Sequence, residues 1–238
     1  NSAFATMEEY ASGGAIENMG TLALVGNNLF RNNVADYGGA IDNYGALNIG
    51  GTNVFSNNIA RFGGGAISNW ETEIVLSGTN TFSGNTANGV ANDIYNDGAL
   101  TIVSGMTSID GGINGAGALD IQSDATLNMN YASIEQGTIN IDGTLMASLR
   151  DTKDTVDIAG TLSGTGNVLL SAGAIGTYDI SAFKDFATEE NIDFGKTYDI
   201  KFSEDMLTAT LSSRDAQSIA ADTGASVAAA GAVSGLAN

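Results

Sequence analysis

A unit of about 25 residues, repeated through the first hundred positions, constrains this chain more than any other feature. Each unit opens with Gly-Gly-Ala-Ile, which begins at Gly13, Gly38 and Gly64, so that the starts lie 25 and then 26 residues apart. A degenerate fourth copy occupies 92–96. A unit this short cannot bury its own apolar face, so the copies must stack on one another. The repeat therefore predicts a solenoid.

The pattern inside each unit predicts strands rather than helices. An Asn stands two residues after each Ile, and an alternating apolar stretch such as Leu22-x-Leu24 follows it. Alternation with period two is typical of a strand, whereas Gly and Asn at this density would destabilise helical or leucine-rich repeats. A Phe-x-x-Asn motif closes each unit, at Phe30–Asn33, Phe55–Asn58 and Phe82–Asn85. We therefore expect an all-β fold, a right-handed parallel β-helix.

Stacked coils place equivalent residues in columns, at an inter-strand spacing of about 4.8 Å. We expect the Ile and Phe columns to point inward, and the Asn column to join its amides at a bend. The predicted columns are Ile16, Ile41, Ile67 and Ile94; Asn18, Asn43, Asn69 and Asn96; and Phe30, Phe55 and Phe82.

The loss of both motifs along the chain suggests its organisation. We expect a parallel β-helix over 1–178, with regular coils over 13–110 and less regular coils over 111–178. Segment 179–212 is rich in aromatic and charged residues, and we expect it to cap the open end of the solenoid. The Ala- and Gly-rich stretch 213–238 is predicted to be a linker or a weak helix.

The paired motifs over 13–85 resemble those of chlamydial polymorphic outer-membrane proteins and related autotransporter passengers. The resemblance implies an exported passenger at the bacterial cell surface that adheres to host cells. It implies contact with the outer membrane only through a C-terminal barrel, which these residues do not include. The implied partner is a protein or glycan on a host or neighbouring cell.

Composition argues against several classes of function. Eight Lys and Arg residues stand against 27 Asp and Glu, and a net charge of -19 repels nucleic acid and anionic membranes. The chain has neither His nor Cys, which excludes Ser-His-Asp and Cys-His catalysis and makes zinc binding improbable. We therefore expect a protein that is not an enzyme and has no cofactor. The best acidic group, Asp151, Asp154 and Asp157, is either a solvated loop or a weak calcium site.

One set of surface residues is a candidate for partner binding. Trp70 occupies the position that Tyr44 and Met19 hold in neighbouring units, so the three would form a row beside the Asn column. Such a row is either ordinary packing or a partner contact at Tyr44 and Trp70.

Three functional hypotheses follow. The first is a non-catalytic adhesin or binding module displayed outside the cell. The alternative is a filament or surface layer that assembles through exposed coil ends, since the chain has no proline to blunt strand edges. A second alternative is a polysaccharide-degrading enzyme, which would need paired carboxylates at a controlled separation.

Overall fold

A computed structural model describes residues 10–224, 226–227, 229–230 and 232 of the 238-residue chain. The chain divides into two compact units, Asn1–Leu145 with Ile158–Gly166, and Met146–Asp157 with Asn167–Asn238.

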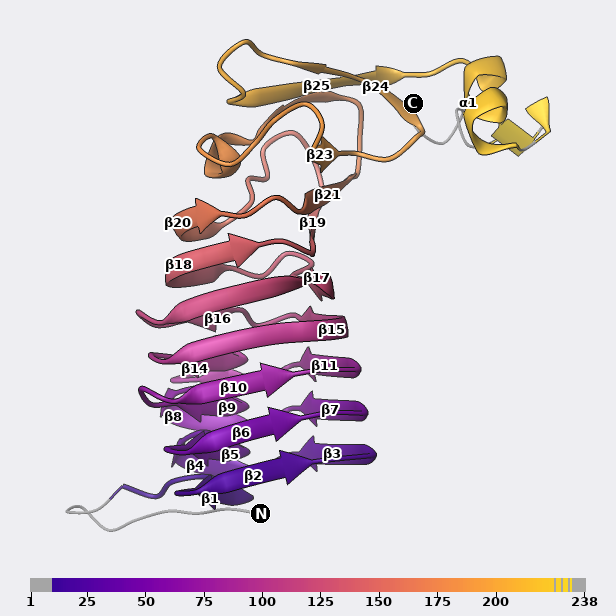
Figure 1. The fold of residues 1–238 in the computed structure, drawn as a ribbon. Coiled ribbons are helices and arrows are strands. Elements are labelled where there is room, and N and C mark those ends of the chain that lie inside the picture. Colours follow the sequence, from indigo (N-terminus) through magenta and orange to yellow (C-terminus); the bar gives the residue numbers. More distant parts are fainter. Residues whose placement is uncertain (1–9, 225, 228, 231, 233–238) are drawn as a thin grey trace. The chain divides into compact units, whose positions relative to one another are not determined.

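The first unit is a parallel β-solenoid, and the whole fold is mostly β with about seven solenoid turns, as predicted (Figure 1). The strands of the first two coils are β1 (Ile16–Asn18), β2 (Thr21–Leu24), β3 (Asn27–Arg31), β4 (Val34–Tyr37), β5 (Ile41–Asn43), β6 (Ala46–Ile49), β7 (Thr52–Ser56) and β8 (Ile59–Gly63). Those that follow are β9 (Ile67–Asn69), β10 (Glu73–Leu76), β11 (Thr79–Ser83), β12 (Thr86–Ala87), β13 (Val90–Ala91), β14 (Ile94–Asn96), β15 (Ala99–Ile109), β16 (Ile113–Asn114), β17 (Ala118–Asn128), β18 (Ile134–Ile141) and β20 (Ile158–Ser163). Strand β19 (Thr144–Leu149) is divided between the two units.

The coils change form along the solenoid. In the early coils β1, β5 and β9 pair in parallel, as do β2, β6 and β10, and β3, β7 and β11 (Figure 1). The fourth strands form a separate sheet, β4-β8-β12-β13, in which β13 is antiparallel. Beyond it, β15 pairs with both β10 and β11, so the second and third strands have merged. The coil that begins at Ile94 has no fourth strand and spans fewer residues than the coils before it. The predicted division between regular coils over 13–110 and less regular coils over 111–178 stays a prediction.

The predicted Ile column is confirmed and is longer than expected. Parallel register pairs each Ile with the Ile of the next coil, giving Ile16, Ile41, Ile67, Ile94, Ile113, Ile134 and Ile158. A second aliphatic column runs Leu22, Leu47, Ile74, Leu100, Leu119, Ile139 and Leu162. Full burial of one such side chain contributes about 1.5–3 kcal/mol, so these columns form a large part of the solenoid core.

The predicted Phe column is also confirmed. The ring centroids of Phe30 and Phe55 lie 4.8 Å apart with an interplanar angle of 5°, and those of Phe55 and Phe82 lie 4.7 Å apart at 4°. These separations match the strand spacing of about 4.8 Å, so the rings stack at the same spacing as the strands that carry them.

The predicted Asn column is a continuous ladder of side-chain amides. Nδ2 of Asn18 donates to Oδ1 of Asn43 at 2.7 Å, Asn43 donates to Asn69 at 2.7 Å, and Asn69 donates to Asn96 at 2.8 Å. Nδ2 of Asn96 then donates to Oε1 of Gln136 at 2.6 Å. Every buried amide of the ladder therefore has a partner in another coil, which offsets the cost of burying it.

Two more polar ladders were not predicted. Asn28 donates to Asn53 and Asn53 donates to Asn80, at 2.8 and 2.9 Å. The Asn residues of the Phe-x-x-Asn motifs form the other: Asn33 donates to Asn58 and Asn58 to Asn85, both at 2.9 Å, and Asn85 donates to Asp93 at 2.7 Å.

The two glycines of the Gly-Gly-Ala-Ile turn have different roles. Gly38 has φ +55°, a left-handed conformation that favours glycine. The backbone of Gly39 instead approaches the next coil, where a Cβ atom would lie 2.1 Å from the carbonyl oxygen of Gly65. The motif is therefore required both by the turn and by the stacking.

The second unit contains an antiparallel sheet and a helix. Its elements are β21 (Asn167–Ala172), β22 (Gly176–Asp179), the 3-10 helix η1 (Ser181–Phe183), β23 (Ile192–Asp193), β24 (Tyr198–Phe202), β25 (Thr208–Ser213) and the α-helix α1 (Ala216–Thr223). Strand β25 pairs antiparallel with both β22 and β24. Tyr178, Phe183 and Phe194 are buried in this unit. The capping role predicted for 179–212 stays a prediction.

Helix α1 shows that the predicted weak helix is formed over part of 213–238. The carboxylate of Asp215 caps its first turn by accepting from the backbone N–H groups of Gln217 and Ser218. Residues 225, 228, 231 and 233–238 lie outside the described residues.

Candidate functional site: an aromatic cluster and its grooves

Aromatic side chains flank the Gly-Gly turns of the solenoid. Tyr37 directly precedes the turn glycine Gly38, and Phe62 stands two residues before Gly64. Tyr44 and Trp70 directly follow ladder asparagines. Because each turn reverses the chain and the coils stack, these side chains meet on one surface. The aromatic cluster consists of Tyr10, Tyr37, Tyr44, Phe62, Trp70 and Tyr95.

Trp70 contacts three other rings of this cluster, as does Tyr37. Its ring centroid lies 5.3 Å from that of Tyr37, 6.2 Å from that of Tyr44 and 5.2 Å from that of Tyr95. The rings of Tyr44 and Trp70 are stacked with an interplanar angle of 14°. All these separations fall in the range of favourable aromatic pairs, about 4.5–7 Å. The structure thus brings together the two residues that the sequence marked for partner contact.

The cluster remains partly open to solvent. Tyr10, Phe62 and Tyr44 are 67%, 44% and 40% exposed. Met19, the third member of the predicted row, is 73% exposed. Exposed aromatic side chains offer large apolar contact areas with little rotamer entropy to lose, and this makes such a surface suited to binding.

A buried carboxylate lies beneath the rings. Asp42 is 0% exposed, and its Oδ1 accepts a hydrogen bond of 2.7 Å from Nε1 of Trp70. Its Oδ2 is buried without a hydrogen bond of ordinary geometry among the described residues, although the hydroxyls of Ser12 and Tyr44 lie close enough to lower the pKa. Burial is the largest influence and raises the pKa of Asp42 overall, with Glu17 adding to the rise.

The pKa values of Tyr37, Tyr44 and Tyr95 are raised. Burial, followed by the hydrogen bond from the Tyr95 hydroxyl to Oδ2 of Asp97 at 2.5 Å, raises the pKa of Tyr95 to about 12. Burial also raises the pKa of Tyr37 and of Tyr44. These hydroxyls therefore act as hydrogen-bonding groups, not as bases, near neutral pH.

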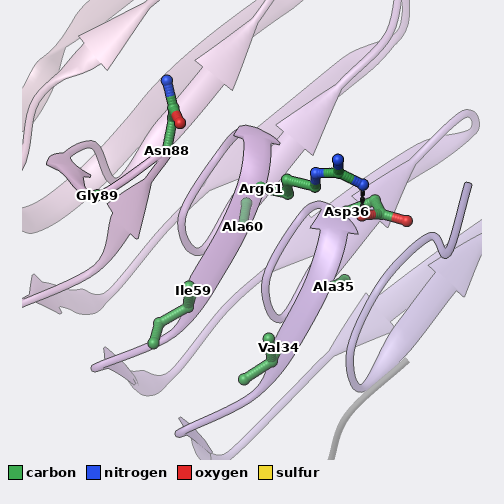
Figure 2. A pocket seen from close by; sticks show the side chains of 8 residues that line it. All are labelled: Val34, Ala35, Asp36, Ile59, Ala60, Arg61, Asn88 and Gly89. Carbon is green, nitrogen blue, oxygen red and sulfur yellow. Dashed lines mark ion pairs between the residues drawn. The ribbon is translucent and has the colours of Figure 1, made fainter. Parts of the chain in front are cut away.

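A shallow groove of about 390 Å³ lies on β4 and β8 (Figure 2). It is lined by Val34, Ala35, Asp36, Ile59, Ala60, Arg61, Asn88 and Gly89. Arg61 lines this groove and also lies over the ring of Phe62, so the groove adjoins the aromatic cluster.

The polar side chains of this groove are the Asp36–Arg61 ion pair and the amide of Asn88. Nη1 of Arg61 lies 3.8 Å from Oδ1 of Asp36, while Oδ2 of Asp36 accepts from the backbone N–H of Ala11 at 3.0 Å (Figure 2). The guanidinium of Arg61 also lies 4.9 Å from the ring centroid of Phe62. The Arg61 side chain is 71% exposed, so its donors are available at the rim of the groove.

Two local irregularities shape this face. The register between β4 and β8 shifts after Ala35, since Ala35 pairs with Ala60 but Tyr37 pairs with Gly63. Such a bulge bends a strand and redirects side chains, here those of Arg61 and Phe62. At the edge of the same sheet β12 and β13 are joined through Asn88 and Gly89, both at positive φ, a two-residue hairpin turn.

A second groove, of about 520 Å³, shares Tyr95 with the aromatic cluster. Its other lining residues are Asn114, Gly115, Ala116, Glu135, Gln136, Gly137, Ala159 and Gly160. The aromatic cluster therefore adjoins one groove at Tyr37 and Phe62 and forms part of another at Tyr95.

The predicted acidic run has a local structural role. Oδ1 of Asp151 accepts from the backbone N–H of Lys153, and Oδ2 of Asp154 accepts from that of Arg150, both at 2.7 Å. Among the described residues, no three His, Cys, Asp or Glu side chains are grouped so that they could hold a metal ion. Asp151, Asp154 and Asp157 therefore do not form such a group. Calcium binding by the run stays a prediction.

Sequence reasoning missed Tyr10, Tyr37, Phe62 and Tyr95. An available signal was the aromatic residue just ahead of two Gly-Gly-Ala-Ile motifs: Tyr37 directly precedes Gly38, and Phe62 stands two residues before Gly64. Asn88-Gly89 was also a readable hairpin signal.

Comparison with known proteins found no relative of this chain. No protein-family model, curated protein or solved structure matches the chain. Within the part of the chain that the structure describes, no helix has the length and apolar character needed to cross a membrane.

Proposed function

We propose that the solenoid is a non-catalytic binding module of adhesin type, displayed outside the cell, whose partner contacts the aromatic cluster. The observation that carries this proposal is the group of six aromatic residues connected by pairwise ring contacts, of which Tyr10, Phe62 and Tyr44 are substantially exposed. They lie on stacked coils fixed by amide ladders, so the surface is held in place before a partner arrives.

Export as an autotransporter passenger belongs to the same proposal. Its support is the resemblance of the repeat motifs, together with the ladders and columns through which those motifs build a solenoid. The lack of His and Cys is compatible with binding rather than nucleophilic catalysis. Labelling intact and permeabilised source cells with an antibody against the chain would test the location. Signal only after permeabilisation contradicts display.

Binding is tested with the fluorescently labelled protein on host cells, matrix proteins and bacterial cells. The variant pair is Phe62→Ala with Tyr44→Ala, which removes two exposed rings and leaves the Asp42–Trp70 hydrogen bond in place. Tyr131→Ala, at a residue 55% exposed outside the cluster, is the matched control. We expect the wild type and the control to bind and the double variant to bind about tenfold more weakly or worse. Absence of binding to every surface, or equal binding by the double variant, contradicts the proposal.

A further inference from the structure

We propose that the aromatic cluster and its two grooves form one extended site for a neutral polysaccharide. This inference rests on the proposed binding function and names its ligand class. It follows from the charge of the site, from the kinds of side chain that line it, and from its extent.

Charge narrows the class of ligand. The chain carries a net charge of -19, which opposes a polyanionic ligand. The groove on β4 and β8 is nevertheless balanced, because Asp36 and Arg61 are the only charged residues among the described ones that line it, and they pair with each other. The guanidinium of Arg61 already lies over Phe62, where a cationic ligand would otherwise bind. The second groove is lined by Glu135 and by no Lys or Arg among the described residues. Neither groove therefore carries a net positive charge, and the site fits an uncharged ligand better than a polyanion.

The side chains fit the chemistry of a sugar. A pyranose ring has apolar C–H faces that pack against aromatic rings, and hydroxyls at its edge that both donate and accept hydrogen bonds. Phe62 and Tyr44 offer the exposed rings, while Arg61 and Asn88 offer polar groups in the adjoining groove. The groove is also lined by the apolar side chains of Val34 and Ile59, of which Ile59 is 47% exposed and is available to pack against a sugar ring.

The extent of the surface favours a polymer over a single sugar. One groove adjoins the cluster next to Tyr37 and Phe62, and the other includes Tyr95, so the polar and aromatic groups continue from groove to cluster to groove. A chain of sugar units would contact all three parts at once, and each added contact would strengthen binding through effective concentration.

Trp70 allows this inference to be tested without altering the protein. It is the single tryptophan of the chain and contacts Tyr37, Tyr44 and Tyr95 within the cluster. Intrinsic fluorescence is followed while neutral hexasaccharides of glucose, mannose or xylose are added. Native gels containing hydroxyethylcellulose, mannan or xylan give an independent measure of binding, with hyaluronan as the polyanionic comparison.

We expect at least one neutral polysaccharide to retard the protein and its hexasaccharide to change the Trp70 fluorescence, while hyaluronan does neither. The Phe62→Ala and Tyr44→Ala double variant should lose about tenfold in affinity, and Tyr131→Ala should match the wild type. No retardation by any neutral polysaccharide overturns the inference. Retardation without a fluorescence change, or unchanged in the double variant, also overturns it, because the ligand then binds elsewhere.

Failure of this inference is distinguishable from failure of the binding function. Periodate cleaves the vicinal diols of sugars and leaves most protein surfaces able to bind. If cell binding requires Phe62 and Tyr44 but survives periodate treatment of the cells, the ligand is not a glycan and the binding function stands. If periodate treatment abolishes that binding, the glycan assignment is supported on the cell surface itself.

Discussion

Nε1 of Trp70 donates a hydrogen bond of 2.7 Å to Oδ1 of Asp42, a carboxylate of the preceding coil. This contact joins the exposed aromatic surface to a fully buried acidic group. The stability of the solenoid and the geometry of the candidate site are therefore coupled at these two residues.

Asp42→Asn should stabilise the fold near neutral pH. Burial raises the folded-state pKa of Asp42, so its contribution to stability is full below the unfolded pKa of about 3.9 and is lost as the pH rises through the folded pKa. The amide cannot ionise, and its oxygen can still accept from Trp70. Urea unfolding at pH 4 and pH 7 should show an advantage for the variant that grows with pH. The exposed Asp124→Asn serves as control, and an advantage independent of pH would contradict this assignment.

Asp93→Asn should have the opposite effect. Burial raises the pKa of Asp93 too, but its carboxylate accepts from Nδ2 of Asn85 at 2.7 Å and from the backbone N–H groups of Asp110 and Gly111 at 3.0 and 2.7 Å. An amide would direct N–H donors at one of these donors, which costs about 1–3 kcal/mol. Chemical denaturation at pH 7 measures the loss. A stabilised variant would refute the view that these three donors require a group at position 93 that only accepts hydrogen bonds.

Asn58→Ala should destabilise the solenoid by about 2 kcal/mol or more. The Asn58 side chain accepts from the backbone N–H and Nδ2 of Asn33, and it donates to Oδ1 of Asn85 and to the carbonyl of Phe30. Alanine leaves these buried groups without partners. Asn27→Ala, on an exposed position of β3, should change the free energy of unfolding by less than about 0.5 kcal/mol. Equal losses would argue against the ladder.

Phe55→Ala should cost about 3–5 kcal/mol, because it removes the central ring of the Phe column and leaves a cavity. Phe62→Ala removes the same atoms from a side chain that is 44% exposed and should cost much less. Thermal and urea unfolding of both variants provide the comparison. Similar losses at the two sites would contradict the separation of core from surface rings.

Gly39→Ala should destabilise the fold by about 1–3 kcal/mol or more, since the new Cβ atom would lie 2.1 Å from the carbonyl oxygen of Gly65. Gly20→Ala is the matched control, because a Cβ atom there meets nothing within 4 Å. Circular dichroism melts of the two variants test the difference. A stable Gly39→Ala protein would show that the coils can separate at this turn.

The columns were predictable because the motifs that form them recur in phase. Ile16, Ile41 and Ile67 follow the same tetrapeptide pattern, and parallel stacking leaves one register in which all are buried. The same reasoning applied to Asn28, Asn53 and Asn80 would have found their ladder, which has no named motif to draw attention to it.

The candidate site was only partly predictable. Alternation along β5 suggests that Asp42 faces solvent, yet rings from other coils cover it. That cover includes Trp70, which belongs to the next coil and donates to Asp42, so a single repeat does not reveal it. The single long strand β15 stands where earlier coils have two strands, and it pairs with both β10 and β11. The sequence there lacks the Phe-x-x-Asn motif, and the absence of a motif does not predict which structure takes its place.

The phase of the columns has a consequence for how such a protein could change in length. Removing residues 38–63, one complete coil, would join Tyr37 to Gly64 and set Ile16 against Ile67 with the polar and apolar rungs still matched. Gains and losses of whole coils thus preserve the fold, whereas a one-residue insertion within a strand shifts every inward side chain outward. Duplication and deletion can therefore change the length of the solenoid by one coil at a time, and the side chains on the remaining coils keep their positions.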